Sequence, residues 1–464
     1  MTSTPDHDVL RRAAEHALAF RSTLPERPVH EDTTPDKLRA ALGGALSADG
    51  VDATDVIDEL VAACADGLIA MAGPRFFGFV IGGSLPVAVA ADWLTSAWDQ
   101  NAGLYIAGPA ASIVEETAGA WMLDALGLPA TASFAFVTGC QMAHVTALAA
   151  ARHAVLARAG WDVNNEGLAG SPPIRVIVGE ERHVTIDRAL RLLGIGARSI
   201  VPVSADDQGR MQPDALADAL ARRGDDGPTI VCAQVGNIDT GAFDPVDAIA
   251  DVAKAHGAWL HVDGAFGLWA AASPAHAHLL NGHDRADSWA TDAHKWLNVP
   301  YDSGFAAVAQ PDSHRAAMAV RAQYLQYASG DNAPRDQVDW TPEFSRRARA
   351  FPVYAALRHL GRSGVSALVD RCCAHARHFA ALIDGHNGAI VLNDVVLNQV
   401  LVDFGAPERT TAVIDAVQAE GTCWLSGTTR HGRPAMRFSV SNWSTTNDDI
   451  ERSAAAILSV AARL

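Results

Sequence analysis

Short apolar runs alternate with helical stretches over the middle of the chain. Each run ends at turn-forming residues, and the segments between runs mostly have the apolar spacing of helices, as in Ala111–Leu126 and Met142–Arg158. This alternation predicts an α/β fold with a mostly parallel sheet that helices cover on both faces. The predicted strands are Ser133–Val137, Arg175–Val178, Ser199–Val203, Ile230–Val235, Trp259–Val262 and Ser288–Ala290.

The first 90 residues have a purely helical pattern. Helical spacing of apolar residues covers Asp8–Phe20, Thr34–Leu46 and Ala53–Ala72, which proline-containing connections join. These stretches contain few residues that could close a core by themselves. We therefore expect a helical arm that packs on something else, namely a second subunit.

The last part of the chain mixes helices and strands. A helix-rich segment follows Arg346, and Ala389–Leu392, Gln399–Phe404 and Met436–Ser441 have the composition of strands. The pattern therefore predicts three parts. They are an N-terminal helical arm for dimerisation (1–90), a large domain (91–350) and a small α+β domain (351–464).

The composition narrows the class of protein. The chain has 464 residues, 49% of them hydrophobic, and a formal net charge of -17. This length can form a large core, whereas an acidic balance without basic stripes argues against a nucleic-acid partner. Six scattered cysteines without a CxxC pair favour a reduced, cytoplasmic protein without a zinc site. No apolar run reaches the roughly 20 residues of a membrane span, and the N-terminus lacks the regions of a signal peptide.

Lys295 stands in an unusual place for a lysine. In ATDAHKWLNVPYDSG (Ala290–Gly304) it lies between a histidine and a tryptophan, after a predicted strand and before a turn. Most lysines at strand ends extend their amine into solvent. A lysine among groups able to bind phosphate also suits a Schiff base with a carbonyl cofactor. Residues at the other strand ends favour this second interpretation.

Three further strand ends carry candidate groups. The turn at Gly139 precedes a helix, whose first N–H groups can bind an anion such as phosphate. His183 could cap a helix, or it could lie against a planar ring and move protons. A buried Asp263 needs a partner, and the protonated nitrogen of a pyridine ring is one. A metal is the rival partner, but no further ligands lie at metal-binding spacing. With Lys295, these groups meet the needs of pyridoxal phosphate.

Five motifs resemble those of one known family, the group II pyridoxal-phosphate-dependent amino-acid decarboxylases, which include aromatic-amino-acid, glutamate and cysteine-sulfinate decarboxylases. The resemblance extends from about Met71 to Trp443. It implies fold type I of the pyridoxal-phosphate-dependent transferases, with a mostly parallel seven-stranded sheet. It also implies a homodimer with the active site at the subunit interface. The motifs are TGCQMAHVTALAAAR (Thr138–Arg152), EERHVTIDRA (Glu180–Ala189), VGNIDTGAFDP (Val235–Pro245), HVDGAFG (His261–Gly267) and DAHKWLNVPYDSG (Asp292–Gly304).

The resemblance assigns roles to individual residues. Lys295 matches the Schiff-base lysine, Asp263 the partner of the pyridine nitrogen, and His183 the histidine that stacks on the ring. Phe79 matches an aromatic position of the substrate pocket, and Leu104 would reach that pocket from the partner subunit. The other cofactor contacts fall on Cys140, Gln141, Asp292 and His294 around the phosphate, Asn237 near the cofactor, and Ala265 on the second face of the ring.

Several positions depart from the family pattern. Cys140 and Gln141 stand where family members have small or hydroxyl residues around the phosphate, which binding by backbone N–H groups tolerates. Asp292 replaces the more usual asparagine, although a carboxylate repels phosphate unless it is protonated or turned away. The loop Gly330–Arg335, which we expect to be mobile, precedes Gln337, where decarboxylating members have a catalytic tyrosine. Tyr324 and Tyr327 lie earlier in the chain and could substitute only in another loop register.

The resemblance implies decarboxylation of an L-amino acid through a Schiff base and a quinonoid intermediate, and we expect an aromatic or apolar substrate. Three alternatives stay open. An aminotransferase would need a cation for the α-carboxylate, and Arg437 is the candidate. Without the loop tyrosine the reaction could instead become an oxidative deamination that yields an aldehyde. A regulatory protein that binds the cofactor without turnover is the third alternative.

Overall fold

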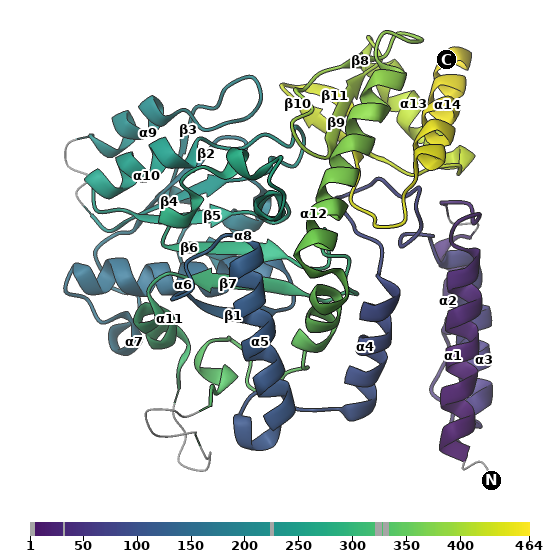
Figure 1. The fold of residues 1–464 in the computed structure, drawn as a ribbon, viewed down its shortest axis with the longest axis horizontal. Coiled ribbons are helices and arrows are strands. Elements are labelled where there is room, and N and C mark those ends of the chain that lie inside the picture. Colours follow the sequence, from purple (N-terminus) through teal and green to yellow (C-terminus); the bar gives the residue numbers. More distant parts are fainter. Residues whose placement is uncertain (1–4, 31–32, 223–226, 321–326, 328–333) are drawn as a thin grey trace.

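A mixed sheet of seven strands organises the larger part of the molecule (Figure 1). The computed structural model describes residues 5–30, 33–222, 227–320, 327 and 334–464. The strand order is β1-β7-β6-β5-β4-β2-β3, in which β7 runs antiparallel to both neighbours and the remaining neighbours are parallel. The prediction of a mostly parallel sheet is therefore confirmed. The strands are β1 (Ser133–Val137), β2 (Arg175–Gly179), β3 (Ile200–Val203), β4 (Thr229–Gln234), β5 (Trp259–Asp263), β6 (Ser288–Asp292) and β7 (Gly304–Val308).

Helices cover both faces of this sheet. In β2, Ile177 belongs to one apolar cluster, whereas Val176 and Val178 belong to another. Successive side chains of a strand point to opposite faces, so β2 is buried on both sides. The surrounding helices are α5 (Pro109–Ala125), α6 (Cys140–Arg158), α7 (Val163–Glu166), α8 (Val184–Leu192), α9 (Pro213–Leu220), α10 (Val246–Ala255) and α11 (Pro311–Met318). Short 3-10 helices are η2 (Tyr105–Ala107), η3 (Ala197–Ser199), η4 (Gly267–Ala272), η5 (Ala277–Leu280), η6 (His283–Arg285) and η7 (Gln337–Asp339).

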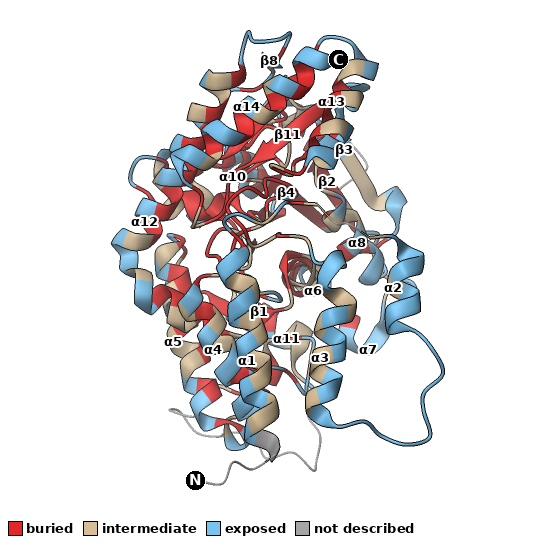
Figure 2. Cartoon of the chain, turned by 90° about the vertical axis from the view of Figure 1, so that its right-hand side faces the viewer, coloured by how far each residue is buried: buried red, intermediate tan, exposed pale blue. Residues whose placement is uncertain are grey.

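The N-terminal helices form an arm beside the main body (Figure 1). The arm consists of α1 (Pro5–Thr23), α2 (Pro35–Leu42) and α3 (Ala53–Cys64), followed by the 3-10 helix η1 (Ala65–Gly67). Neither α2 nor α3 contains a buried residue, and Figure 2 shows α1 and α3 largely exposed. Both α2 and α3 end earlier than predicted. The pair Gly43-Gly44 follows α2, and α3 tightens into η1 before Leu68 adopts an extended backbone.

A second, smaller sheet lies near the C-terminus. Its four strands follow the order β10-β11-β9-β8 and are antiparallel. The strands are β8 (Ile390–Val391), β9 (Gln399–Asp403), β10 (Ser426–Arg430) and β11 (Arg433–Ser439), with helices α13 (Pro407–Glu420) and α14 (Asn447–Arg463). The long α12 (Ala350–Ile383) contacts elements of both parts, including α4 (Pro86–Trp98), α5 and β9.

Residues 74–84, the crossing segment, connect the small sheet to the turn that contains Lys295. The Phe77 N–H donates to the Trp424 carbonyl at 2.7 Å, and the Phe77 carbonyl accepts from the Ser439 N–H at 2.9 Å. Further along, Gly82 lies so close to the Lys295 carbonyl that an added Cβ would overlap with it. The crossing segment therefore contacts both parts of the molecule.

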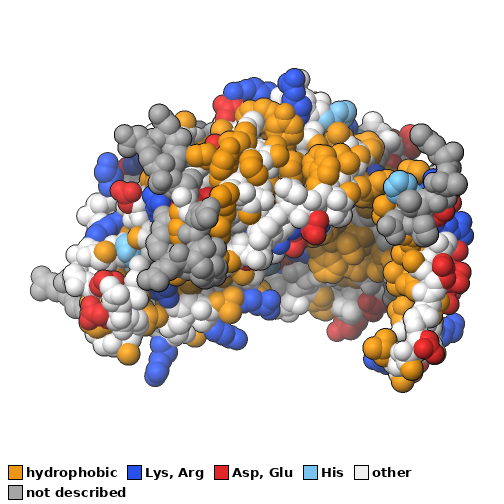
Figure 3. Space-filling model, turned by 90° about the horizontal axis from the view of Figure 1, so that it is seen from below, with side chains coloured by type: hydrophobic (Ala, Val, Ile, Leu, Met, Phe, Trp, Pro, Cys, Tyr) orange, Lys and Arg blue, Asp and Glu red, His pale blue; other side chains and the backbone are white. Residues whose placement is uncertain are grey.

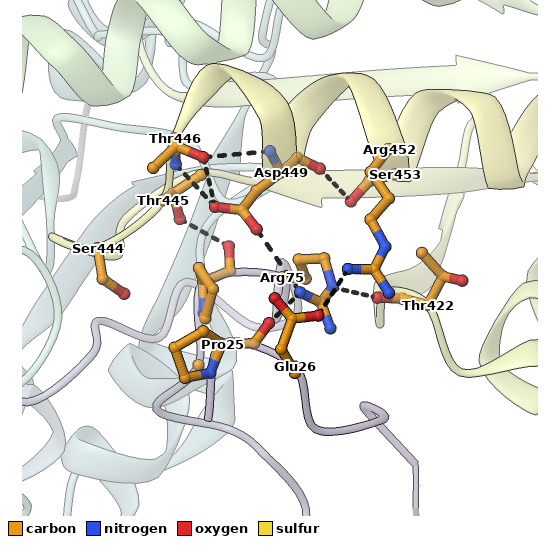
Figure 4. Close-up of polar contacts among 12 residues, drawn as sticks. Pro25, Glu26, Arg75, Thr422, Ser444, Thr445, Thr446, Asp449, Arg452 and Ser453 are labelled. Carbon is orange, nitrogen blue, oxygen red and sulfur yellow. Dashed lines mark hydrogen bonds and ion pairs between the residues drawn. The ribbon is translucent and has the colours of Figure 1, made fainter. Parts of the chain in front are cut away.

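Arg75, at the start of the crossing segment, binds several chain segments at once (Figure 4). Its guanidinium is buried and donates to the carbonyls of Pro25, Arg27 and Thr422. It also pairs with Asp449 at 3.6 Å, whose carboxylate belongs to the capping box of α14. One side chain thus joins the end of the arm to the C-terminal part.

Large apolar side chains are exposed on the arm and on the neighbouring helices. Figure 3 shows hydrophobic side chains over the lower face and a hollow between the arm and the body. No helix among the described residues is both long and apolar enough to cross a membrane. The exposed apolar residues of this region include Leu10, Leu18, Leu42, Val56, Leu60, Trp93, Leu94, Trp98, Ile106 and Ile113.

Candidate active site

The carboxyl ends of three strands bring the polar residues of the predicted site together. Asp263 ends β5 and Asp292 ends β6, its neighbour in the sheet. The strand β7 lies between β6 and β1 and places Gly304 opposite both Asp292 and Val137. The start of α6 consequently lies beside Asp292, and the Cys140 N–H donates to its Oδ1 at 2.5 Å.

Lys295 has a buried, charged environment at this edge. Its Nζ lies 3.2 Å from Asp292 Oδ2, and the lysine side chain is 18% exposed. Burial alone would lower the pKa of Lys295, but the carboxylates of Asp292 and Asp263 outweigh it and the pKa is raised. The amine is therefore held as a cation by Asp292.

The N-terminus of α6 lies beside Asp292 and His294. Its Cys140 N–H already binds one carboxylate oxygen, and His294 Nε2 lies 3.4 Å from the same oxygen of Asp292. Burial lowers the pKa of His294. Gln141 donates through Nε2 to the Thr185 carbonyl at 3.2 Å, and its buried Oε1 has no hydrogen-bond partner among the described residues. Helix N–H groups, an imidazole and an amine are the donors that a phosphate needs.

Asp263 is 4% exposed and yet ionised. Burial raises its pKa, but the contact with His144, the nearby His183 and the Lys295 cation together outweigh burial, so the pKa lies below its usual range. The Ala265 N–H donates to Asp263 Oδ1 at 3.2 Å, and His144 Nε2 lies 3.5 Å from Oδ2. A buried carboxylate of this kind can hold a proton on a ring nitrogen.

The sequence motifs did not single out His144. It stands one helical turn after Cys140 on α6, so both side chains lie on the same face of the helix. Cys140 Sγ, His144 Nε2 and an Asp263 oxygen lie within 4.8 Å of one another, and these atoms are possible metal ligands. The i, i+4 spacing of a cysteine and a histidine was the available signal.

His183 caps α8 and faces the same site. Its Nδ1 lies 2.8 Å from the Thr185 hydroxyl. Burial lowers the pKa of His183, while Asp263 raises it, and Lys295 and Arg437 lower it further. The imidazole is therefore neutral near pH 7. The cavity beside it is lined by Glu180–Val184, Ile238, Asp239 and Thr429–His431.

Two predicted cofactor contacts lie beside the strand ends in loops. Ala265 follows β5, and Thr291 and Asp292 donate to its carbonyl. The buried side chain of Asn237 is used by its own turn, since Oδ1 accepts from the N–H groups of Asp239 and Thr240. Ala265 packs against the small apolar cluster that contains Cys140 and Ala290, whereas Asn237 shapes the loop after β4.

The predicted pocket residues fall into two groups. Phe79 belongs to the crossing segment, where its ring lies 5.1 Å from that of Trp424. Leu104 and Gln337 lie instead beside α5, where Gln337 Nε2 donates to Ser112 Oγ at 3.0 Å. The Val338 N–H donates to the Gly103 carbonyl, which holds these two segments together.

Part of the expected loop lies outside the described residues. This applies to 330–333 and to Tyr324, whereas Tyr327 is described and its hydroxyl donates to the Val320 carbonyl. Gln337 is fully buried, so its amide is part of the packing beside α5. The Gln337 side chain therefore has no role as an acid.

Arg437 reaches the site from β11 of the small sheet. It is buried, donates to Ser426 Oγ at 3.1 Å, and pairs with Asp239 at 3.6 Å. Burial lowers its pKa and Asp239 raises it. The guanidinium therefore lies at the junction of the small sheet and the loop after β4, close enough to His183 to affect its pKa.

Comparisons with known proteins agree with this arrangement. A family model described as "Pyridoxal-dependent decarboxylase conserved domain" matches residues 35–404. Tryptophan decarboxylase 1 of Oryza sativa subsp. japonica is 28% identical over 93% of this chain and 88% of its own. Acidic amino acid decarboxylase GADL1 of Mus musculus is 30% identical over 80% of this chain and 67% of its own. 4-Hydroxyphenylacetaldehyde synthase of Rhodiola rosea is 29% identical over 76% of this chain and 71% of its own.

A solved structure has the same fold. The crystal structure of Oryza sativa TDC with PLP and tryptamine matches 100% of this chain and 99% of that chain, with a TM-score of 0.92. The two sequences are 24% identical, so this likeness concerns the fold.

Proposed function

Because the chain belongs to the pyridoxal-dependent decarboxylase family, we propose that its substrate is an L-amino acid with an aromatic or apolar side chain. The chain is an amino-acid decarboxylase, and its cofactor is pyridoxal phosphate. We also propose a homodimer and roles for single residues.

The observation that carries the substrate class is an aromatic group at the crossing segment. The Phe76 and Trp424 rings stack at 4.9 Å, and Phe79 packs against Trp424. Phe79 remains 53% exposed and has a φ of 57°, a left-handed conformation that is costly for a bulky residue. Strain of this kind persists where the surrounding structure enforces it, often at ligand-binding positions. A planar apolar side chain would pack well on these rings.

The donor set described above fits pyridoxal phosphate. When bound, this cofactor supplies an aldehyde that combines with amines and a ring that draws electrons from the α-carbon. The Lys295 amine would bind the aldehyde, and the ionised Asp263 would hold the proton on the ring nitrogen. His183 and Ala265 would flank the ring. The phosphate would be held by the α6 start at Cys140 and Gln141 and by His294, with Asp292 beside it and Asn237 shaping the neighbouring loop.

The remaining groups would act on the substrate. Arg437 is the cation available for the α-carboxylate, and its pairing with Asp239 keeps it oriented. The rings of Phe79 and Trp424 would exclude water from that carboxylate, which favours loss of carbon dioxide over a hydrated, stable anion. With an amide at Gln337, the neutral His183 is the group that would return a proton to the α-carbon.

A second outcome is supported by Gln337. Without an acidic side chain at this position, protonation of the α-carbon is slower and reaction with dioxygen competes. Each substrate would then consume one dioxygen and one water and release carbon dioxide, ammonia, hydrogen peroxide and an aldehyde. The similarity to 4-hydroxyphenylacetaldehyde synthase agrees with this alternative.

We also propose a homodimer whose two subunits share each active site. The support is the exposed apolar side chains on the arm, α4 and η2, among them Leu10, Leu18, Trp98 and Ile106, since gathered exposed apolar residues mark interaction surfaces. Leu104 and Gln337 lie on this side of the molecule, beside α5. In a dimer the half-buried Leu104 would contact the site of the partner subunit, whereas the buried Gln337 would only hold the Leu104 segment in place.

The assignment of Lys295 is tested by chemical trapping. The sequence contains three lysines, of which Lys37 and Lys254 are exposed. We expect borohydride reduction of the holoenzyme to attach the cofactor to the peptide that contains Lys295, as detected by mass spectrometry. Lys295→Ala should lack both the adduct and the visible absorbance band, whereas Lys254→Ala should retain them. Cofactor attached at another lysine would refute the assignment.

The substrate class is tested by a panel of amino acids. Aromatic, aliphatic and acidic L-amino acids are incubated with the holoenzyme, and carbon dioxide, amine, aldehyde and peroxide are measured together. We expect the highest kcat/KM with an aromatic or apolar substrate. Equal amounts of carbon dioxide and amine identify simple decarboxylation, whereas aldehyde with peroxide identifies the second outcome. A preference for acidic substrates would contradict the proposed class.

A further inference from the structure

A chain of buried hydrogen bonds lies behind Asp263. His144 Nε2 faces Asp263 Oδ2 at 3.5 Å, and His144 Nδ1 lies 2.9 Å from His261 Nε2. His261 Nδ1 lies 2.9 Å from Ser288 Oγ, which accepts from Trp259 Nε1 at 2.9 Å. All five residues are buried. None of the steps proposed above uses the two histidines.

The fold places these residues in line. His261 precedes Asp263 by two positions in β5, so their side chains share a face of the sheet. Ser288 of β6 lies opposite His261 in the parallel register. His144 comes from α6, which contacts both β5 and β6. The chain of contacts therefore runs along one face of the sheet to its carboxyl edge.

With both imidazoles neutral, one arrangement of the protons along these contacts gives Asp263 a donor and leaves each ring nitrogen a partner. Trp259 Nε1 can only donate, so the Ser288 hydroxyl accepts from it and keeps its own proton for His261 Nδ1. Burial and the neighbouring His144 lower the pKa of His261 to about 3, so its ring is neutral and carries its one proton on Nε2. That proton is donated to His144 Nδ1. A neutral His144 then carries its proton on Nε2, toward Asp263.

The opposite arrangement is unfavourable. If His144 donated from Nδ1 to His261, its Nε2 lone pair would face the ionised Asp263 at 3.5 Å. Ser288 Oγ would then receive two donors, from Trp259 and from His261. Cys140 Sγ, 3.3 Å from His144 Nε2, could donate to that lone pair, but the buried carboxylate would lose a donor. Loss of a hydrogen bond to a buried charge is costly.

We propose that His144 is a positioning residue that donates from Nε2 to Asp263 and thereby keeps this carboxylate ionised and directed at the cofactor ring. His261 and Ser288 fix the tautomer of His144. This inference rests on the proposed role of Asp263 and adds a residue to it. It makes the strength of cofactor binding depend on a hydrogen bond that does not touch the cofactor.

Three substitutions of His144 separate its two nitrogens. His144→Leu removes both, His144→Gln keeps an amide N–H near the position of Nε2, and His144→Asn keeps one near the position of Nδ1. A hydrogen bond to a charged group contributes about 1.5 to 3 kcal/mol, which corresponds to about 10- to 100-fold in an equilibrium constant. We expect His144→Leu to weaken cofactor binding and to lower kcat by at least about tenfold, with KM little changed.

The measurements are the cofactor Kd, from quenching of tryptophan fluorescence in the apoenzyme, and kcat and KM of the holoenzyme at saturating cofactor. His144→Gln should recover most of the loss and His144→Asn little of it. His375→Leu is the control. This buried histidine of α12 contacts the Thr445 carbonyl and is not part of the chain of contacts behind Asp263. Ser288→Ala, a smaller change at the far end, should weaken cofactor binding in the same direction.

Several results would overturn the inference. His144→Leu could bind the cofactor as tightly as the unmodified protein, or Asn could recover as much as Gln. Stoichiometric zinc in the purified protein, lost in His144→Leu, would assign Nε2 to a metal shared with Cys140 and Asp263. If the unmodified protein does not bind the cofactor through Lys295, the proposed function fails instead. Binding by the unmodified protein together with unchanged His144 variants refutes the role of His144 alone.

Discussion

Asp292 determines the charge of the lysine next to it. Its carboxylate lies 3.2 Å from Lys295 Nζ and, with that of Asp263, raises the pKa of Lys295 against the effect of burial. An amine combines with an aldehyde only in its neutral form. Since the neutral fraction increases with pH up to the raised pKa, capture of the cofactor by the apoenzyme should become faster as the pH rises from 7.

Asp292→Asn should remove this dependence in part. Without the carboxylate, burial dominates and the pKa of Lys295 falls, so more of the amine is neutral at pH 7. We expect cofactor capture, followed by stopped-flow absorbance, to be about tenfold faster for each pH unit by which the pKa drops. Asp302→Asn is the control, because Asp302 lies in the same turn as Lys295 but pairs with Arg349. A slower capture in Asp292→Asn would mean that the carboxylate orients the amine for attack.

Gly82 shows how a residue without a side chain can affect the site. A Cβ at this position would overlap with the Lys295 carbonyl, whereas Gly196 has nothing within 4 Å of its own added Cβ. We expect Gly82→Ala to lower the unfolding free energy by about 1–3 kcal/mol and to weaken cofactor binding. Gly196→Ala should leave both unchanged. Unfolding in urea and cofactor titration check this, and unaltered cofactor binding in Gly82→Ala would show that the turn can move aside.

Some site residues could be predicted from the sequence because a polar residue directly after a short apolar run marks the end of a buried strand. Lys295, Asp263 and Asp292 each follow an apolar run, and the structure brings them to one edge of the sheet. No apolar run precedes His144 in this way, and its contact with His261 joins residues 117 positions apart, which a local pattern does not show. The hydrogen bonds that Asn237 Oδ1 accepts within its own turn were not predicted either, because a motif does not show which side-chain atoms bind the backbone of a loop.

Among the elements, the connection between the arm and the small sheet depends on Arg75 (Figure 4). Its buried guanidinium serves three carbonyls and Asp449. Breaking a buried ionic contact by removing one partner costs about 3–5 kcal/mol. We expect Arg75→Ala to lose stability of this size in urea unfolding and to make the arm more sensitive to limited proteolysis.

Arg452 provides the comparison for Arg75. It lies in the same region and pairs with Glu26 at 3.2 Å, but both side chains are exposed. Exposed ion pairs contribute about 0–1 kcal/mol. Arg452→Ala should therefore be close to neutral. If the two variants lost the same unfolding free energy, the effect would come from the general charge of the surface and not from the buried contacts of Arg75.

The elements that escaped prediction share a reason. The strand β7 follows β6 through the lysine turn, outside the strand–helix alternation, and its apolar core resembles any buried segment. The strand β10 reads SGTTR, without the apolar alternation that marks a strand, because one side of it faces solvent. The helix α4 was hidden in an apolar stretch interrupted by glycines and a proline, which in fact begins the helix at Pro86. Tertiary pairing, which the sequence pattern does not contain, decides these segments.

At the scale of the whole molecule, the exposed apolar surface predicts the oligomeric state. Ile106 in η2 is 59% exposed and lies two residues from Leu104. We expect the protein to sediment as a dimer and Ile106→Asp to shift it toward the monomer, with a loss of kcat because the proposed contact of Leu104 with the partner site would be lost. Analytical ultracentrifugation measures this change.

The control is an apolar residue that is equally exposed elsewhere. Ile390 in β8 is 52% exposed, at the edge of the small sheet. Ile390→Asp should leave both the sedimentation and the activity unchanged. A monomeric unmodified protein with full activity would contradict both the dimer and the shared site.

The crossing segment limits which substitutions could give this enzyme a new substrate. Within eleven positions it carries an anchor for the arm, the ring of Phe79 that we propose for the substrate pocket, and the glycine beside the lysine turn. Random mutagenesis of this stretch would thus return mostly unfolded or cofactor-free clones. Trp424 contacts the Phe79 ring from the connection between α13 and β10, and its hydrogen bonds to the crossing segment use backbone atoms, so libraries that vary the Trp424 side chain should be the richer source of altered selectivity.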